Sequence, residues 1–196
     1  AVGHTTATFE DVRLAMLCGV SQVTHLFNGM EPLHHRTPGA VGAGLALDGL
    51  RCQLIADNIH VHPAVLKLAV RAKGPEGIIL ITDAMGGAGM PDGDYELGGQ
   101  HVIVRGGECR LEDGTLASST LTMESAVRNI ARTCGLSLEA ALPMATRVPA
   151  ESIGVAGRKG AIAVGMDADL IVIDREVNVY MTMVRGDVVY QRPDMA

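Results

Sequence analysis

The stretch Gly77–Met90, GIILITDAMGGAGM, decides how the rest of this chain is interpreted. Its four consecutive aliphatic residues, Ile78 to Ile81, predict a strand that is buried on both faces, as in parallel α/β sheets. The run ends at Asp83, and a glycine-rich loop follows directly. Because α/β enzymes carry catalytic groups at the carboxyl ends of their parallel strands, Asp83 is a candidate site residue.

Two earlier segments repeat this arrangement with histidine. His4 follows the strand-like residues 1–3, and His25 follows the apolar segment that begins at Val20. Imidazole and carboxylate groups are common ligands of divalent metals. Two imidazoles and one carboxylate at three strand ends therefore predict a site that converges on a metal ion.

Composition and charge narrow the class of protein. The chain has 196 residues, 47% of them hydrophobic, and a net charge of −6 with no basic stripe, so we expect neither nucleic acid nor a membrane surface as partner. It has no apolar run of about 20 residues and no secretion leader, and its four cysteines form no CxxC pair, which together predict a cytoplasmic protein with reduced thiols. It begins at AVGH without an initiator methionine, so we expect a fragment or a processed product.

Strands and helices are predicted to alternate up to the central strand. Thr8 is a predicted N-cap, with Glu10 and Asp11 in the first turn of a helix that Gly19 ends. A polar loop is expected over 29–44, and Pro63 is predicted to open a helix that runs to about residue 71. Strands are expected near residues 1–3, 20–27, 50–56 and 78–83.

The pattern changes after residue 94. Short alternating segments over 95–117 predict a β-hairpin excursion, and helices are expected over 122–134, 137–145 and 149–154. The tail, 160–191, is predicted to form short strands at 161–164, 170–174 and 184–189. We therefore predict one domain over 1–154, with a hairpin insertion near 94–117, and strands of a small β-domain over 155–196.

About four βα-type strands are too few for a closed (β/α)8 barrel, which takes eight strands and about 250 residues. A doubly wound dinucleotide fold needs an early GxGxxG, and the glycines of 39–44 lack that spacing.

Several short motifs carry a resemblance along essentially the whole chain. They are Gly3-His4, Thr24-His-Leu-Phe-Asn-Gly-Met30, Arg36-Thr-Pro-Gly39, Ile55-Ala-Asp-Asn-Ile-His60, Thr82-Asp-Ala84 and Ser119-Thr-Leu-Thr-Met123. Together they resemble the N-acetylglucosamine-6-phosphate deacetylases. The tail motif, 165–174, resembles the end of amidohydrolase-superfamily enzymes in general.

The resemblance implies an α/β fold: the C-terminal half of a (β/α)8 TIM-like barrel plus part of a small β-sandwich domain. It implies a metal-dependent hydrolase that removes acetyl from N-acetylglucosamine 6-phosphate, with a divalent metal ion, zinc foremost, as cofactor. The expected partners are this phosphorylated amino sugar and either a second copy, in a homodimer, or an N-terminal half supplied separately.

The resemblance also assigns roles to residues. It makes His4 and His25 metal ligands and Asp83 the catalytic acid–base. Asn28 and Gly29 correspond to a sugar-contacting turn, Leu121 to part of the pocket wall, and Arg36 and His60 to groups that contact the phosphate in a neighbouring subunit's site.

The metal-ligating glutamate and the carbonyl-polarising histidine of these enzymes belong to their N-terminal half, which this chain lacks. Two alternatives therefore stay open. One is another amidohydrolase, dihydroorotase-like or D-aminoacylase-like, in which Arg36 would have no phosphate to bind. The other is a non-catalytic half that needs a partner chain, because half a barrel leaves sheet edges and apolar surface uncovered.

Overall fold

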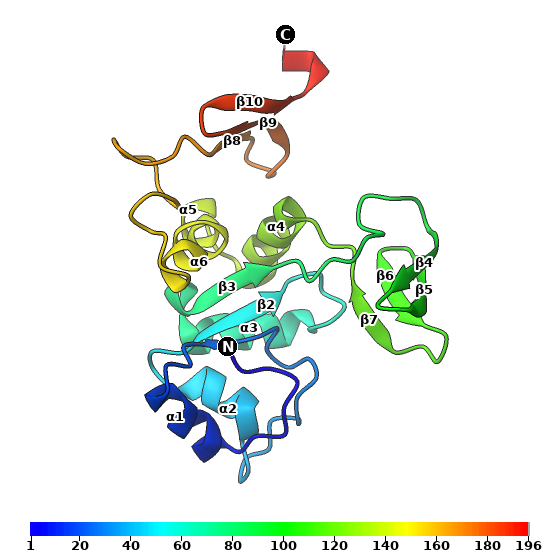
Figure 1. The fold of residues 1–196 in the computed structure, drawn as a ribbon, viewed down its shortest axis with the longest axis vertical. Coiled ribbons are helices and arrows are strands. Elements are labelled where there is room, and N and C mark those ends of the chain that lie inside the picture. The colour runs from blue at the N-terminus through cyan, green and yellow to red at the C-terminus, as the bar shows by residue number, and fades with distance from the viewer. Residues whose placement is uncertain (196) are drawn as a thin grey trace.

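A parallel sheet forms the centre of the computed structural model, which describes residues 1–195 (Figure 1). Its strands are β1 (Gln22–Val23), β2 (Arg51–Ile55) and β3 (Ile78–Ile81), side by side in that order. An isolated parallel bridge joins Val2 to Val23 and adds the N-terminal segment beyond β1. The four predicted strand segments therefore follow one another across the sheet in sequence order, and the predicted α/β class is confirmed.

Helices and short 3-10 turns connect and cover these strands. Their bounds are α1 (Phe9–Leu17), α2 (Gly39–Ala46), α3 (Pro63–Lys73), η1 (Pro75–Gly77), α4 (Met123–Cys134), α5 (Leu138–Ala141), η2 (Leu142–Ala145) and α6 (Arg147–Ser152). Helix α1 begins as predicted. The Thr8 hydroxyl accepts from the Asp11 N–H at 3.2 Å, and the Asp11 carboxylate accepts from the Thr8 N–H at 2.9 Å, which completes a capping box.

Helix α2 corrects the prediction of a loop over the whole of 29–44. Its sequence, GAVGAGLA, is rich in glycine, which disfavours helix in isolation. The packing explains the glycines, because a Cβ at Gly42 would lie 2.2 Å from the Pro38 Cβ and one at Gly44 would lie 3.0 Å from Leu26. Close packing therefore requires glycine in a helix that propensity alone does not predict.

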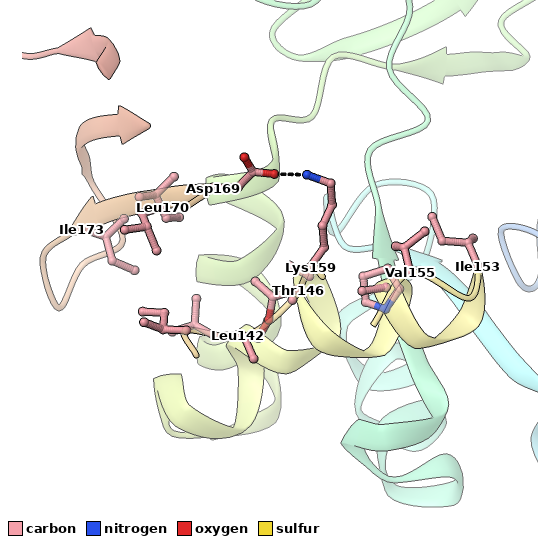
Figure 2. A pocket seen from close by; sticks show the side chains of 15 residues that line it. Leu142, Thr146, Ile153, Val155, Lys159, Asp169, Leu170 and Ile173 are labelled. Carbon is pink, nitrogen blue, oxygen red and sulfur yellow. Dashed lines mark hydrogen bonds and ion pairs between the residues drawn. The ribbon is translucent and has the colours of Figure 1, made fainter. Parts of the chain in front are cut away.

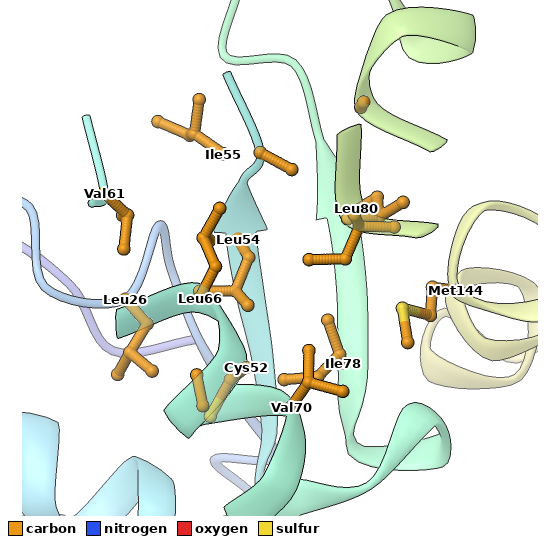
Figure 3. Packing of buried hydrophobic residues seen from close by; sticks show 14 of the residues in the cluster. Leu26, Cys52, Leu54, Ile55, Val61, Leu66, Val70, Ile78, Leu80 and Met144 are labelled. Carbon is orange, nitrogen blue, oxygen red and sulfur yellow. The ribbon is translucent and has the colours of Figure 1, made fainter. Parts of the chain in front are cut away.

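The core lies on both faces of β2 and β3, and Figure 3 shows part of it. Leu66 and Val70 of α3 lie on one side of the strands, and Met144 of η2 lies on the other. Ile78 is fully buried. Burying a side chain of this size contributes about 1.5–3 kcal/mol, so this double-faced layer is the main source of stability.

A second sheet is formed by the part of the sequence between β3 and α4. It is antiparallel, with β4 (Gly93–Leu97), β5 (Gln100–Arg105), β6 (Glu108–Leu111) and β7 (Leu116–Ser119) in sequence order. The sequence predicts a hairpin here, whereas the structure has four strands. Paired glycines with positive φ, at 98–99 and 106–107, make two of the turns. The sheet has its own small cluster of buried residues, which includes Val102 and Cys109.

The tail forms a third sheet, with β8 (Leu170–Ile173), β9 (Val179–Val184) and β10 (Asp187–Gln191) antiparallel in the order β10-β9-β8, followed by η3 (Pro193–Met195). Figure 1 shows it apart from the parallel sheet, beyond α4 and α5. Two tail predictions are wrong: residues 161–164 form no strand, and 184–189 contains the turn at Arg185 and Gly186 between β9 and β10.

Candidate active site at the carboxyl edge of the parallel sheet

The backbone is in the left-handed region just past each of the four strand segments. His4 has φ 44°, His25 27°, Asn58 65° and Asp83 49°. Such values are uncommon for residues other than glycine and cost about 1–3 kcal/mol each, and they cluster at functional sites. Three of these four residues are the ones that the sequence predicts as metal ligands and catalytic acid. The strain therefore marks this edge of the sheet as the candidate site.

His4 and His25 lie against each other. Their ring centroids are 4.6 Å apart with the planes at 84°, an edge-to-face arrangement. The His4 side chain is exposed, whereas His25 is buried and 7% exposed. Within the described residues, the His25 Nδ1 is a buried polar atom without a hydrogen-bond partner. A buried nitrogen left without a partner is costly, so its place beside a second imidazole fits a pair of metal ligands.

The turn after His25 supports this pair. The Gly29 carbonyl accepts from the Thr5 N–H at 3.1 Å, which joins the turn to the segment that carries His4. Gly29 has φ 61°, and a Cβ there would lie 2.7 Å from the His4 Nδ1. The side-chain amide of Asn28 donates to the His25 carbonyl at 3.2 Å. Asn28 therefore braces the turn through its NH2 group, which leaves its side-chain oxygen for a ligand.

Asp83 is held through its backbone. Its carbonyl accepts from the Ser118 hydroxyl and from the Ser119 N–H, and the Ser119 hydroxyl donates to the Thr82 carbonyl. Its carboxylate is exposed and makes no hydrogen bond or ion pair within residues 1–195. The role of Ser118 and Ser119 was not predicted from the sequence. Their position directly after the predicted β excursion, 95–117, is the feature that could have indicated it.

The three groups do not form one metal cluster. Asp83 follows β3, which lies two strands away from β1 and the turn that carries His25, and neighbouring strands are about 4.8 Å apart. In the part of the chain that the structure describes, no set of three or more His, Cys, Asp or Glu residues is arranged to hold a metal ion. Among the described residues, His4 and His25 therefore supply two adjacent nitrogen donors without a third ligand, and convergence with Asp83 on one ion stays a prediction.

His60 lies in the loop after β2, paired with Asp57. The His60 Nδ1 is 2.6 Å from the Asp57 Oδ2, and both side chains are 7% exposed. Burial raises the pKa of Asp57. The His60 hydrogen bond and the N–H groups of Ile59 and His60 outweigh it, so this pKa lies below its ordinary value. Asp57, whose role the sequence leaves undecided, is thus an ionised partner of His60.

Arg36 and Leu121 occupy different surroundings. Arg36 is exposed and lines a cavity of about 740 Å³ between residues 6–10 and 31–39. Its guanidinium lies 2.7 Å from the His35 ring, and no hydrogen bond or ion pair joins it to His60 within the described residues. Leu121 is 8% exposed and packs in the main core. The structure therefore brings together the His4–His25 pair with Asn28 and Gly29, but leaves Arg36 and His60 apart.

Another cavity, of about 570 Å³, lies away from all of these residues. Figure 2 shows its lining, which comes from Leu142 and Thr146 on one side and from Leu170 and Ile173 of β8 on the other. Lys159 pairs with Asp169 at its edge. None of the predicted site residues lines this cavity, so it marks the junction with the tail sheet and not the candidate site.

Within residues 1–195, no helix has both the length and the apolar character that crossing a membrane requires.

Comparisons with known proteins show the family of the chain. The model of the amidohydrolase family matches residues 1–189. The N-acetylglucosamine-6-phosphate deacetylase of Bacillus subtilis is 43% identical over 190 residues, which are 97% of this chain and 48% of that protein. A putative N-acetylgalactosamine-6-phosphate deacetylase of Escherichia coli K12 is 44% identical over 83% of this chain and 96% of its own length. The resemblance predicted from the motifs is confirmed.

A solved structure agrees as well. The crystal structure of N-acetylglucosamine-6-phosphate deacetylase from Thermotoga maritima matches with a TM-score of 0.93 at 40% identity and covers 97% of this chain and 52% of that one. The chain thus spans about half the length of most of the curated relatives it matches, the short protein of Escherichia coli K12 being an exception.

Proposed function

Because the chain belongs to the amidohydrolase family, we propose that it is the C-terminal portion of a deacetylase that acts on N-acetylglucosamine 6-phosphate in the cytoplasm. The reaction releases acetate and glucosamine 6-phosphate. The observation that carries the proposal is the strained strand ends, where His4, His25 and Asp83 all have positive φ at one edge of the parallel sheet. The finer architecture, half of a TIM-like barrel with part of a β-sandwich, belongs to the same proposal.

His4 and His25 would hold a divalent cation, with zinc as the first choice. Two adjacent imidazoles, one with a buried nitrogen that lacks a partner, suit a borderline-soft ion of this kind. When bound, such an ion polarises the amide carbonyl and lowers the pKa of a coordinated water to about 7. A third protein ligand would come from the part that the relatives have and this chain lacks.

Asp83 would act as the general acid–base. Its carboxylate, exposed and without a protein partner among residues 1–195, is free to take a proton from the attacking water and to return it to the leaving amine. Ser118 and Ser119 hold its backbone, so the group is positioned without using the carboxylate. Asn28 and Gly29 would contact the sugar, and Leu121 would contribute to the wall.

Arg36 and His60 would recognise the phosphate of a substrate bound by a second subunit. The exposure of Arg36 at a cavity supports this arrangement, since its guanidinium is accessible to a group from outside this chain. A guanidinium and an imidazole together are well suited to a phosphate. We therefore propose a homodimer of the complete enzyme.

The test measures acetate release from N-acetylglucosamine 6-phosphate with zinc, for the chain alone and for the chain co-expressed with the N-terminal half of the Bacillus subtilis relative. Asp83→Asn should lower the rate at least about 100-fold, because a general acid–base contributes that much. Asp48→Asn, which removes the same charge from an exposed loop, should leave it unchanged. If neither preparation released acetate, the proposal would be overturned.

The galactosamine epimer is assayed in parallel, because the Escherichia coli K12 relative carries that name. Zinc binding by the chain alone, measured by equilibrium dialysis, gives a second readout. His25→Ala should weaken it at least about tenfold, whereas His101→Ala, in the β4–β7 sheet, should not.

A further inference from the structure

The loop that follows β2 is built around one carboxylate. The Asp57 Oδ1 accepts from the Ile59 N–H at 2.8 Å and from the His60 N–H at 2.9 Å. Its Oδ2 lies 2.6 Å from the His60 Nδ1. A single buried side chain thus shapes the backbone with one oxygen and contacts the imidazole with the other.

The donor in the Asp57–His60 contact can be assigned. An ionised carboxylate has only acceptors, so the proton between the two groups belongs to the His60 Nδ1. The lowered pKa of Asp57 agrees with this assignment. The second ring nitrogen, Nε2, has no partner among residues 1–195. The His60 side chain is only 7% exposed, and its Nε2 is the one ring nitrogen left for a ligand.

We propose that Asp57 is the positioning residue of the phosphate subsite: it holds the His60 Nδ1–H inward so that Nε2 faces the phosphate of the amino-sugar phosphate. This inference rests on the proposed function. A phosphate needs a donor at Nε2, and the negative charge of Asp57 compensates the positive charge that His60 then carries. The carboxylate thereby fixes the direction of the ring and supports its charge.

The loop after β2 is also held by residues other than Asp57. The role of Asp57 in positioning His60 can therefore be tested separately from its role in holding the loop. The Asn129 side chain of α4 donates to the Ala56 carbonyl at 2.9 Å, and the Thr133 hydroxyl donates to the Asn58 Oδ1 at 3.3 Å. These bonds hold the loop to α4 independently of Asp57. A change that affects only the Asp57 Oδ2 is therefore expected to alter His60 without releasing the loop.

Asp57→Asn is that change. The amide oxygen can keep both backbone hydrogen bonds, whereas the NH2 group takes the place of Oδ2 and is a donor facing Nδ1. His60 must then accept at Nδ1 and carry its proton on Nε2. Nitrogen-15 NMR of the histidine rings in the purified chain distinguishes the two forms, because protonated and unprotonated ring nitrogens have well-separated shifts.

The wild-type chain should show a protonated Nδ1 at His60, and Asp57→Asn should show an unprotonated one. Asp48→Asn, at an exposed site, should match the wild type. If Asp57→Asn kept the wild-type ring signals, or if the wild type had its proton on Nε2 alone, the positioning role would be overturned.

Kinetics of the co-expressed enzyme give the functional arm. Loss of a charge-assisted contact should raise KM for the phosphorylated sugar about 10- to 100-fold in Asp57→Asn, with kcat changed less than about threefold. N-acetylglucosamine without phosphate should show no such increase. In a His60→Gln background the Asp57 change should add nothing, since Asp57 acts through His60. An additive effect, or an equal loss for both sugars, contradicts the proposal.

The two proposals fail in different ways. If no preparation hydrolyses either sugar phosphate, the proposed function fails, and glucosamine 6-phosphate added to the chain still tests the subsite through the His60 Nε2 signal. If hydrolysis occurs but Asp57→Asn keeps the wild-type KM, only the positioning role is overturned.

Discussion

Two strands of nearly the same composition behave differently in this molecule. Strand β3 has the sequence IILI and strand β8 has LIVI. Ile78 of β3 is completely buried, whereas Ile171 of β8 is 51% exposed. Both strands lie at the edge of a three-stranded sheet, but helices pack against β3, whereas Ile171 and Val172 of β8 remain exposed. The difference teaches that burial depends on what packs against a strand, because the side chains themselves are equivalent.

The ends of the same two strands differ as well. Asp83 follows β3, and its carboxylate has no partner among residues 1–195. Asp174 follows β8, and its carboxylate accepts from the Asn178 N–H at 2.8 Å, the Glu176 N–H at 3.0 Å and the Asn178 side chain at 2.7 Å. A strand followed by aspartate therefore produces a candidate catalytic group in one place and a loop anchor in the other.

The largest expected difference between the two regions is in stability. Ile78→Ala removes a fully buried side chain from a packed layer and should lower the free energy of unfolding by about 2–5 kcal/mol. Ile171→Ala, at a half-exposed site, should lower it by less than about 1 kcal/mol. Urea unfolding at constant m-value measures both. Equal losses would break the comparison and would mean that β8 is covered by another chain in solution.

A smaller effect is expected where the two regions are joined. Arg128 of α4 donates to the Glu176 carbonyl at 2.8 Å and to the Val177 carbonyl at 3.1 Å, which ties the tail to the helix. Arg128→Ala should weaken this attachment by about 1–2 kcal/mol. Hydrogen exchange should then quicken in β8 and β9 while β2 and β3 keep their protection.

Arg132→Ala, one turn further along α4 at an exposed site, is the matched control and should change neither sheet. Faster exchange throughout the molecule in Arg128→Ala would indicate that the tail and the layer open as one unit.

The smallest effect concerns pH in the tail. The Asn178 N–H and side chain hold the pKa of Asp174 below its ordinary value of 3.8. A carboxylate with a lowered pKa in the folded state stabilises the fold above its unfolded pKa, and this contribution is lost as the pH falls through the folded one. The melting temperature of wild type relative to Asp174→Asn should therefore decline below about pH 4.

The Asp48 carboxylate has no partner among residues 1–195. The melting temperature of Asp48→Asn should therefore follow that of the wild type over the same pH range. A constant offset between the wild type and Asp174→Asn would show that the loop does not depend on the charge of Asp174.

Much of the fold is predictable because its signals are local. The N-cap at Thr8, Pro63 in the first turn of α3 and the aliphatic run before Asp83 all occur where the sequence predicts them. The start of α2 and the second pair of strands in the excursion were missed. Gly44 of α2 is required by close contacts with Val23, Leu26 and Cys52, which are distant in the sequence, and such contacts have no local signature.

The sequence by itself determined the class of fold, the strand ends that carry His4, His25 and Asp83, and the family, because short motifs and aliphatic runs depend on neighbouring residues. Only the tertiary structure decided that two imidazoles meet while Asp83 lies two strands away, and that Asp57 serves His60. It also decided that IILI is core and LIVI is surface. The physical reason is that distances between strands and the covering of a sheet face arise from packing between residues far apart in the chain.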